Sequence, residues 1–151
     1  MRWRKPACSG SENVGYDKNN IFAKILRGEI PSYKVYEDAH TLSFMDVMPQ
    51  SNGHTLVIPK SQAEDFFDVD PQVLGALMVV TQKIAHAVKR AFNPDGVRIM
   101  QFNGPTAGQT VFHIHIHIVP CYEGVPLKAH TRDFEDKNVL AANAEKIRAA
   151  L

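Results

Sequence analysis

Three histidines recur at every second position of one short segment, at His113, His115 and His117. Side chains of a β-strand point alternately to its two faces, so this spacing predicts three imidazoles on one face. A neutral imidazole, with an ordinary pKa of about 6.5, is a nucleophile and a proton-transfer group near neutral pH. In a row of three, one ring can attack an acyl or phosphoryl centre while its neighbours bind anionic oxygens or move protons. The pattern therefore favours nucleophilic catalysis.

A metal site is the alternative use of such a row. A strand rises about 3.3 Å per residue, which separates His113 from His117 by about 13 Å along the backbone. Because zinc–nitrogen bonds are about 2.0–2.1 Å long, all three rings reach one ion only if the strand bulges or twists strongly. A pair of them with a third ligand from elsewhere stays open as the weaker interpretation. We expect no metal and no other cofactor.

The histidines belong to a segment, Val111 to Val119, that alternates strictly and predicts a strand with one apolar and one imidazole face. The loop before it, residues 104–110, contains glycines that allow backbone amides to approach a bound anion. By itself the loop is weak support for a ligand site.

Further strands and helices are predicted around this segment. Asp70 followed by Pro71 is typical of a helix start, and apolar residues at helical spacing extend that helix to Phe92. The other expected strands are Tyr33–Glu37, Thr41–Asp46, His54–Ile58 and Val97–Phe102, and the other expected helices are Ile21–Arg27 and Leu140–Leu151. Together they indicate an α+β domain of mainly antiparallel strands with one long helix packed across them.

The pattern divides the chain into a tail and one domain. Residues 1–16 are expected to form a flexible tail, which lacks the apolar segment of a secretory signal. Residues 17–151 are expected to form a single domain, with its core in residues 17–123 and a C-terminal extension and helix in residues 124–151.

Composition limits the partners that we expect. The 151 residues include 17 Lys and Arg against 16 Asp and Glu, a net charge of +1. Sequence-independent nucleic-acid binders and membrane-surface proteins use concentrated positive charge, so neither nucleic acid nor membrane is expected as a partner. The longest apolar run, Val73 to Val80, is far shorter than the roughly 20 residues of a membrane-spanning helix. The two cysteines, Cys8 and Cys121, suggest no disulfide framework, which indicates a reducing, cytoplasmic setting.

Three blocks of this chain resemble one known family. The segment GQTVFHIHIHIVP (Gly108 to Pro120) resembles the signature of the histidine triad (HIT) superfamily, H-x-H-x-H followed by apolar residues. Two upstream blocks are similar to those of its Hint and bacterial HIT-like branches, in the same order and at similar spacing. They are IFAKILRGEIPSYKVYED (Ile21 to Asp38) and FMDVMPQSNGHTLVIPK (Phe44 to Lys60). The resemblance covers about residues 17–123.

This resemblance implies a fold and an activity. The implied HIT-like fold has an antiparallel sheet of about five strands, one long helix and short terminal helices, and its sheet continues across a homodimer. The implied activity is hydrolysis of purine nucleoside phosphoramidates or related conjugates of AMP or GMP. Cleavage at the α-phosphate would pass through a nucleotide bonded to a histidine and release the nucleoside monophosphate, so purine nucleotides are the implied ligands.

Roles for individual residues follow from their positions in the motif. His115 is the implied nucleophile, His117 lies near the phosphate, and His113 holds the geometry from behind. His54 matches a histidine that supports the triad, and Asp46 matches an acidic residue that accepts hydrogen bonds from the ribose hydroxyls. The implied nucleotide-binding set also includes Phe22, Ile25, Phe44 and Val47 at the base, and Asn103, Gly108, Gln109 and Thr110 around the phosphate.

Without the resemblance, most of these residues have plainer interpretations. The apolar ones would be assigned to the core, Asp46 to a strand end, and His54 and Thr110 to ordinary strand positions. The remaining histidines are interpreted as surface or helix-face residues, and Lys60 as an exposed lysine. These histidines are His40, His86 and His130.

Departures from the family pattern also carry predictions. Some relatives hold a structural zinc with a Cys-x-x-Cys pair and two histidines, and Asn20 and Ala23 occupy the cysteine positions here. We therefore predict no zinc at that place. The third triad position is His117 and not glutamine, which favours hydrolysis over nucleotidyl transfer to a sugar phosphate.

Two other functions stay open. One is a dinucleoside polyphosphate hydrolase, which the lack of an obvious cationic clamp beyond the α-phosphate disfavours. The other is a nucleotide-binding regulatory protein in which hydrolysis is incidental, and a complete triad makes this less favoured.

Overall fold

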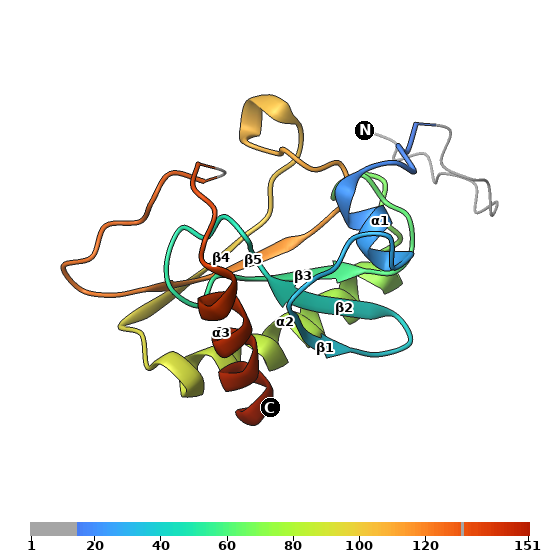
Figure 1. Cartoon of the computed structure of the whole chain (residues 1–151). Coiled ribbons are helices and arrows are strands. Elements are labelled where there is room, and N and C mark those ends of the chain that lie inside the picture. The colour runs from blue at the N-terminus through green and yellow to red at the C-terminus, as the bar shows by residue number, and fades with distance from the viewer. Residues whose placement is uncertain (1–14, 131) are drawn as a thin grey trace, which may run out of the picture.

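The computed structural model describes residues 15–130 and 132–151, so most of the expected tail, residues 1–16, lies outside the described residues. The described chain has the α+β fold that the sequence predicts, with five strands and three α-helices (Figure 1). In chain order these are α1 (Ile21–Leu26), β1 (Lys34–Glu37), β2 (Thr41–Met45), β3 (Thr55–Pro59), α2 (Pro71–Phe92), β4 (Gly96–Met100), β5 (Ile116–Cys121) and α3 (Lys137–Ala149). A short 3-10 turn, η1 (Pro105–Ala107), lies in the loop between β4 and β5.

The strands form one sheet in the order β1-β2-β3-β5-β4. Every neighbouring pair is antiparallel, as expected for the family that the sequence resembles. The central strand is β3, which pairs with β2 on one side and with β5 on the other. Within the described residues, β4 pairs only with β5 and is therefore an edge strand.

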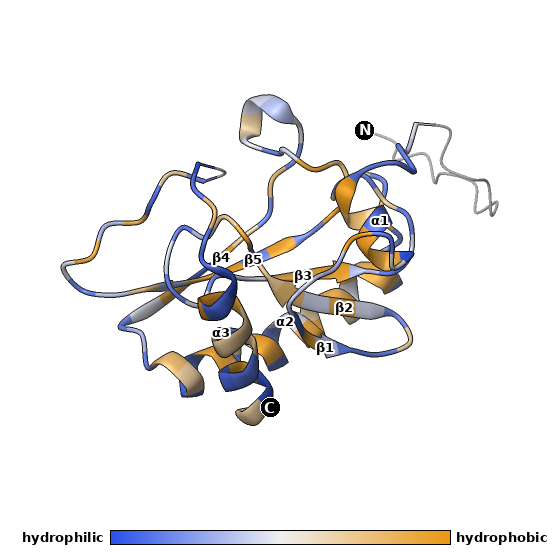
Figure 2. Ribbon diagram, viewed as in Figure 1, coloured by the Kyte–Doolittle hydropathy of each residue, from blue (hydrophilic) through white to orange (hydrophobic). Residues whose placement is uncertain are grey.

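Apolar clusters cover both faces of the sheet. On one face, Val57 and Ile118 pack against α2 and α3, which lie side by side below the sheet in Figure 1. On the other face, Phe22 of α1 packs against Phe44 and Leu56. Hydrophobic colouring runs along the strands and through α1 in Figure 2. Because alternate residues of a strand face opposite sides, both faces bury apolar groups and the central strands are buried throughout.

The long helix α2 begins and ends where the sequence predicts. The Asp70 side chain accepts hydrogen bonds from the first-turn amides, and Pro71 occupies the first helical position. At the other end Asn93 adopts a left-handed conformation with φ of 46° and ends the helix. Neither α2 nor any other helix of the described residues is long and apolar enough to cross a membrane.

The prediction of a continuous strand from Val111 to Val119 was wrong in its first half, because β5 begins only at Ile116. The neighbouring strand β3 ends at Pro59, which has no N–H to continue the ladder. The Pro59 carbonyl instead accepts a hydrogen bond from His113 Nε2 at 2.8 Å, and the Ile114 amide donates to Ala63 O. The chain thus enters the sheet between His115 and His117, and the histidines lie at the end of a strand.

Candidate active site

A cavity of about 180 Å³ opens on the side of the sheet that α1 covers. Most of its wall is apolar, and polar groups enter it at one end, as is common for small-molecule sites. The predicted site residues that line it are Phe22, Ile25, Phe44, Asp46, Val47, Thr110, His115 and His117. The structure therefore brings the predicted base, ribose and phosphate residues to one place.

Other predicted site residues lie close to the cavity but do not line it. The side chains of His54 and His113 are fully buried behind it. Asn103 Oδ1 accepts a hydrogen bond from the Phe66 amide, and Gln109 Oε1 accepts one from the Gly104 amide, each at 2.8 Å. Gly108 has φ of 103° and turns the chain at the end of η1. The side-chain amides of Asn103 and Gln109 thus brace the loop, and their contact with a phosphate stays a prediction.

One hydrogen bond fixes the reactive nitrogen of His115. Its Nδ1 lies 2.6 Å from the backbone oxygen of His113. A carbonyl only accepts, so Nδ1 carries the proton and Nε2 keeps a free electron pair. The ring lines the cavity and makes an edge-on contact with Phe22, with ring centroids 4.9 Å apart. His115 is therefore held as the tautomer that a nucleophile requires.

A second chain of hydrogen bonds fixes His117 in the opposite tautomer. The Gln50 amide donates to His54 Nδ1 at 3.0 Å, so the proton of neutral His54 lies on Nε2. This Nε2 lies 2.9 Å from His117 Nδ1 and donates to it, which leaves the His117 proton on Nε2. Among the described residues, His117 Nε2 is buried without a hydrogen-bond partner. A buried donor without a partner is costly, and a bound anion would satisfy it.

Burial keeps these histidines neutral. Desolvation lowers the pKa of both His115 and His54 to about 4. Burial, followed by the nearby His115 and His54, also places the pKa of His117 well below its ordinary value. The charged form of an imidazole loses more hydration on burial than the neutral form, which explains the direction. Near pH 7 the tautomers described above are therefore the populated species.

Tyr16 supports the triad from behind, although the sequence assigned it to the tail. It is only 7% exposed, and its hydroxyl is hydrogen-bonded to His113 Nδ1. Because His113 Nε2 donates to Pro59 O, its Nδ1 must accept, and Tyr16 is the donor. Both nitrogens of the His113 ring are thus satisfied, and the carbonyl that orients His115 belongs to a fixed residue.

His130 is a site residue that sequence reasoning missed. It was interpreted as a surface or helix-face histidine, but it lines the cavity from the segment before α3. Its Nε2 lies 3.5 Å from Asp46 Oδ2, and its ring makes an edge-on contact with that of His117 at 5.0 Å. Its segment has no periodicity or motif that indicates this placement. The contact with Asp46 joins residues 84 positions apart, which local sequence patterns do not report.

The network around Asp46 does not favour a metal centre. Asp46, His54 and His117 have potential ligand atoms within 4.8 Å of one another. His54 Nδ1 already accepts the Gln50 amide hydrogen, so its Nε2 must carry a proton and cannot ligate a cation while that bond holds. The hydrogen bond between His54 Nε2 and His117 Nδ1 accounts for the contact between these two rings without an ion.

Comparison with known proteins agrees with this geometry. Residues 27–124 match the HIT domain. The chain belongs to the HIT family. A relative from Bacillus subtilis (strain 168), Protein hit, is 40% identical over 127 residues, which cover 81% of this HIT protein and 88% of the relative.

Solved HIT structures share both the fold and the sequence. A Hit-like protein involved in cell-cycle regulation from Bartonella henselae is 50% identical, with a TM-score of 0.85 over 91% of this chain and 99% of that one. A hypothetical histidine triad nucleotide-binding protein from Sulfolobus tokodaii strain7 is 34% identical, with a TM-score of 0.79 over 85% and 89% of the two chains. A Zn-bound histidine triad family protein from Mycobacterium smegmatis is 37% identical, with a TM-score of 0.77 over 87% and 92%.

In this HIT protein, Asn20 replaces the first cysteine expected of a zinc-binding relative. Its Oδ1 accepts a hydrogen bond from the Ala23 amide at 2.8 Å and caps α1. The residue thus stabilises the helix start, a role that needs no metal. That no zinc binds here stays a prediction.

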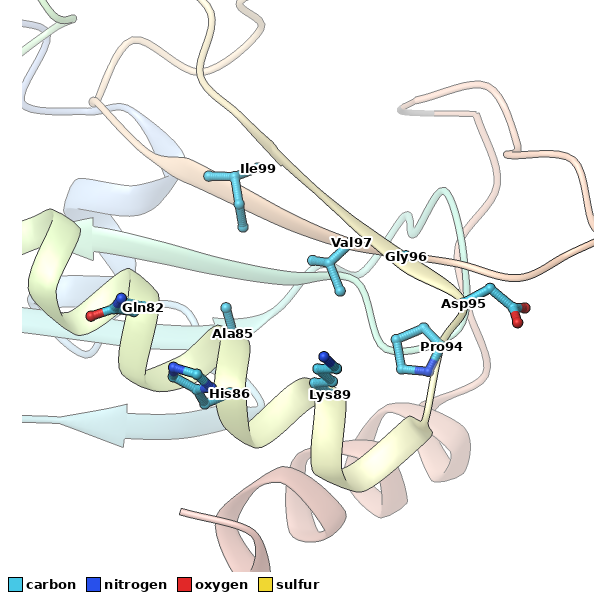
Figure 3. Close-up of a pocket in the computed structure, with 9 residues that line it drawn as sticks. All are labelled: Gln82, Ala85, His86, Lys89, Pro94, Asp95, Gly96, Val97 and Ile99. Carbon is cyan, nitrogen blue, oxygen red and sulfur yellow. The ribbon is translucent and has the colours of Figure 1, made fainter.

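A second cavity of the HIT protein, about 380 Å³, lies between α2 and β4 (Figure 3). It is on the sheet face opposite the triad. Val97 and Ile99 of β4 point from the strand toward α2, which contributes His86 and Lys89. None of its described lining residues belongs to the triad network, so we assign the chemistry to the smaller cavity.

Proposed function

We propose that this HIT protein hydrolyses purine nucleoside phosphoramidates or related nucleotide conjugates at the α-phosphate. The hydrogen bond from His115 Nδ1 to His113 O carries the proposal, because it leaves Nε2 of a cavity-lining imidazole free to attack. Membership of the HIT family, with a histidine triad nucleotide-binding protein among its structural relatives, supports a nucleotide as the substrate.

The proposed reaction has two displacements at phosphorus. In the first, His115 Nε2 forms a bond to the α-phosphorus, and the P–N bond to the leaving amine breaks as the amine takes up a proton. In the second, water attacks the same phosphorus, loses a proton, and releases the nucleoside monophosphate and free His115. His117 Nε2–H, a buried donor without a hydrogen-bond partner among residues 15–130 and 132–151, binds the phosphoryl oxygen on which charge develops.

The cavity wall suits a nucleoside. The aromatic rings of Phe22 and Phe44 pack edge to face and line an apolar space for a purine base. Asp46 lies at the polar end, where its carboxylate accepts hydrogen bonds from the ribose hydroxyls. The base and sugar therefore position the α-phosphate over His115.

The charge of the wall favours a single phosphate over a long polyphosphate chain. The described lining residues of this cavity include no lysine or arginine. Polyphosphates are usually neutralised by such residues or by a metal ion. We therefore propose a phosphoramidate in preference to a dinucleoside polyphosphate.

Trapping the covalent intermediate tests the proposal. The wild-type protein is mixed with an adenosine 5′-phosphoramidate, quenched during turnover, and analysed by mass spectrometry of the intact protein and of its peptides. We expect an adenylyl adduct on the peptide that contains His115. His115→Ala should lose the adduct and at least about a thousandfold of turnover, because covalent catalysis is removed while the cavity remains. His40→Ala, in an exposed turn, is the matched control and should keep both.

The outcome against the proposal is equally specific. Turnover within tenfold of wild type in His115→Ala would exclude His115 as the nucleophile. A rate on a diadenosine polyphosphate that exceeds the rate on the phosphoramidate would reassign the substrate class, and nucleotide binding without adduct or product would indicate a binding protein.

A further inference from the structure

The segment between β5 and α3 is fastened to the loop that carries Asp46 and His54. We call its described residues, 122–130 and 132–136, the C-terminal strap. Lys128 N–H donates to Gln50 O at 2.8 Å, and the Gln50 side chain donates back to Lys128 O at 3.2 Å. Further along, Glu135 N–H donates to Val47 O at 2.9 Å. These bonds attach the strap to the loop at positions on either side of residue 130 in the sequence.

His130 lies between these attachment points and faces the cavity. Its Nε2 is 3.5 Å from Asp46 Oδ2, and its ring is 5.0 Å from the His117 ring and 6.0 Å from the His54 ring. Its side chain is 21% exposed, so it closes the cavity wall while keeping contact with solvent. The strap therefore contributes one side chain to the site.

The contacts of Asp46 show what this side chain can do. Asp46 Oδ1 accepts a hydrogen bond from the Met48 amide at 2.8 Å. Oδ2 lies 3.4 Å from His54 Nε2, but that nitrogen donates its one proton to His117. His130 is therefore the group placed to donate to Oδ2. A donor on each oxygen would fix the plane of this carboxylate, which lines the cavity and keeps further electron pairs to accept hydrogen bonds from a ligand.

We propose that His130 is a positioning residue for sugar recognition, which donates from Nε2 to Asp46 Oδ2 and orients that carboxylate toward the hydroxyls of a bound ribose. The inference rests on the proposed function, because it assumes a nucleotide in this cavity. It adds a residue of the C-terminal strap, 15 positions beyond the nucleophile, to the nucleotide site. The binding of a sugar that lacks the vicinal hydroxyls should not depend on the orientation of Asp46.

The test compares two ligands that differ only at the sugar. Calorimetric titrations with AMP and with 2′,3′-dideoxy-AMP are run on wild type, His130→Ala and His130→Gln. We expect His130→Ala to weaken AMP binding about tenfold and to leave dideoxy-AMP binding unchanged, since the loss of the hydrogen bond to Asp46 leaves that carboxylate less well oriented toward the ribose hydroxyls. His130→Gln, whose amide nitrogen can reach the same carboxylate, should recover most of the AMP affinity. His40→Ala is the surface control.

A double-mutant cycle separates this role from general support of the fold. In an Asp46→Asn background, His130→Ala should cause no further loss of AMP affinity. Equal weakening of both ligands in His130→Ala would overturn the inference, because it would indicate loss of cavity structure. Tighter AMP binding would also overturn it and identify His130 as a competitor of the ribose. Failure of the wild-type protein to bind either nucleotide would instead refute the proposed function on which the inference rests.

Discussion

At His115, a single backbone carbonyl decides which ring nitrogen is free to react. The same logic applies at His117, where His54 and the Gln50 amide place the proton on the opposite nitrogen. Adjacent rings of identical chemistry are thus held in opposite tautomers by their hydrogen-bond partners, which suits the proposed roles of His115 as nucleophile and His117 as donor.

Burial sets the pH range in which this arrangement works. Desolvation lowers the pKa of His115 to about 4, so the nucleophile stays neutral until the pH falls through that value. We expect kcat/KM for an adenosine phosphoramidate to have an acid limb near pH 4, well below the ordinary imidazole value of about 6.5. The measurement is a pH–rate profile from about pH 3.5 to about pH 8.

Two controls accompany that profile. His115→Ala gives the background rate, because P–N bonds hydrolyse in acid without a catalyst. Circular dichroism at each pH shows whether the protein remains folded. An acid limb centred near 6.5 in a folded protein would contradict the assignment of a desolvated, neutral nucleophile.

Tyr16 allows the buried hydrogen bonds of the triad to be tested singly. Tyr16→Phe removes only the hydroxyl that donates to His113 Nδ1 and leaves a buried acceptor without a partner. We expect a loss of about 1–3 kcal/mol in the free energy of unfolding, measured by urea titration, with a fall in kcat as the His113 carbonyl becomes less fixed. Tyr36→Phe, which loses a hydrogen bond to Asp38 in the β1–β2 turn, is the matched control.

Tyr36→Phe separates the effect of losing support for the triad from the effect of losing any tyrosine hydroxyl. Tyr36→Phe should change stability by less than about 1 kcal/mol and leave kcat unchanged, since its partner is near the surface. If both variants lose the same stability and neither loses activity, Tyr16 does not support the catalytic histidines.

At the scale of elements, the sequence predicted those helix and strand ends that residues near the end determine. The helix α2 was predicted at its observed ends because Asp70, Pro71 and Asn93 act within a turn of the helix termini. The histidine strand was predicted too long. Its first residues do not pair in the sheet, since the His113 side chain bonds to Pro59 O and the Ile114 amide to Ala63 O. Apolar and polar residues still alternate in the part of the segment that precedes β5 and pairs with no strand. Periodicity alone therefore could not show where the strand begins.

The part of the site that lies in the sequence motifs was predictable, and the part that depends on contacts outside them was not. Its apolar wall and its triad follow from three sequence blocks that match family motifs, and the structure brings most of those residues to one cavity. His130 and Tyr16 were not predictable, because each reaches the site only through contacts with residues distant in the sequence, from a segment without periodicity. Tertiary packing alone decides such contacts.

The turn before His54 contains a glycine that the packing requires. Gly53 has φ of 93°, and a Cβ atom placed on it would lie 2.8 Å from Phe92 Cδ2 at the end of α2. Gly53→Ala therefore combines backbone strain with a steric clash, and we expect a loss of about 2–4 kcal/mol in the free energy of unfolding. Urea titration measures it, and nucleotide turnover should fall as His54 shifts.

Gly28→Ala isolates the backbone part of this cost. Gly28 has a similar φ of 76°, and a Cβ there would meet nothing within 4 Å. Gly28→Ala should lower the free energy of unfolding by only about 1 kcal/mol. Equal losses in the two variants would mean that Phe92 moves aside freely and that the turn is not held by packing.

At the scale of the whole molecule, the β4 edge of the sheet is a surface without a partner strand among the described residues. One side of β4 carries backbone groups that no strand of the described residues pairs with. Apolar side chains lie exposed beside it, with Ile99 at 45% and Met78 of α2, which lines a cavity with Ile99, at 42%. Figure 3 shows Ile99 at this edge, above α2. An exposed strand edge flanked by apolar side chains is a template for pairing with another chain.

We therefore expect a homodimer in which β4 pairs with β4 of a second copy and the two sheets continue as one. Light scattering after size exclusion should give about twice the 16.9 kDa of the chain. Ile99→Lys places a charge at the centre of this edge and should shift the protein to monomer, because burying an unpaired charge in the interface is costly. Val139→Lys changes an exposed apolar residue of α3 instead and should leave the dimer intact.

The position of the triad predicts what dissociation does to activity. The cavity lies on the α1 side of the sheet, and its described lining residues come from α1, β2, β3, β5 and the connecting loops, with none from β4. The Ile99→Lys monomer should therefore still bind AMP, with its affinity reduced by less than about tenfold. A wild-type monomer in solution would refute the dimer, and equal dissociation by Val139→Lys would move the interface away from β4. Complete loss of AMP binding in a folded monomer would show instead that the nucleotide site needs the second copy.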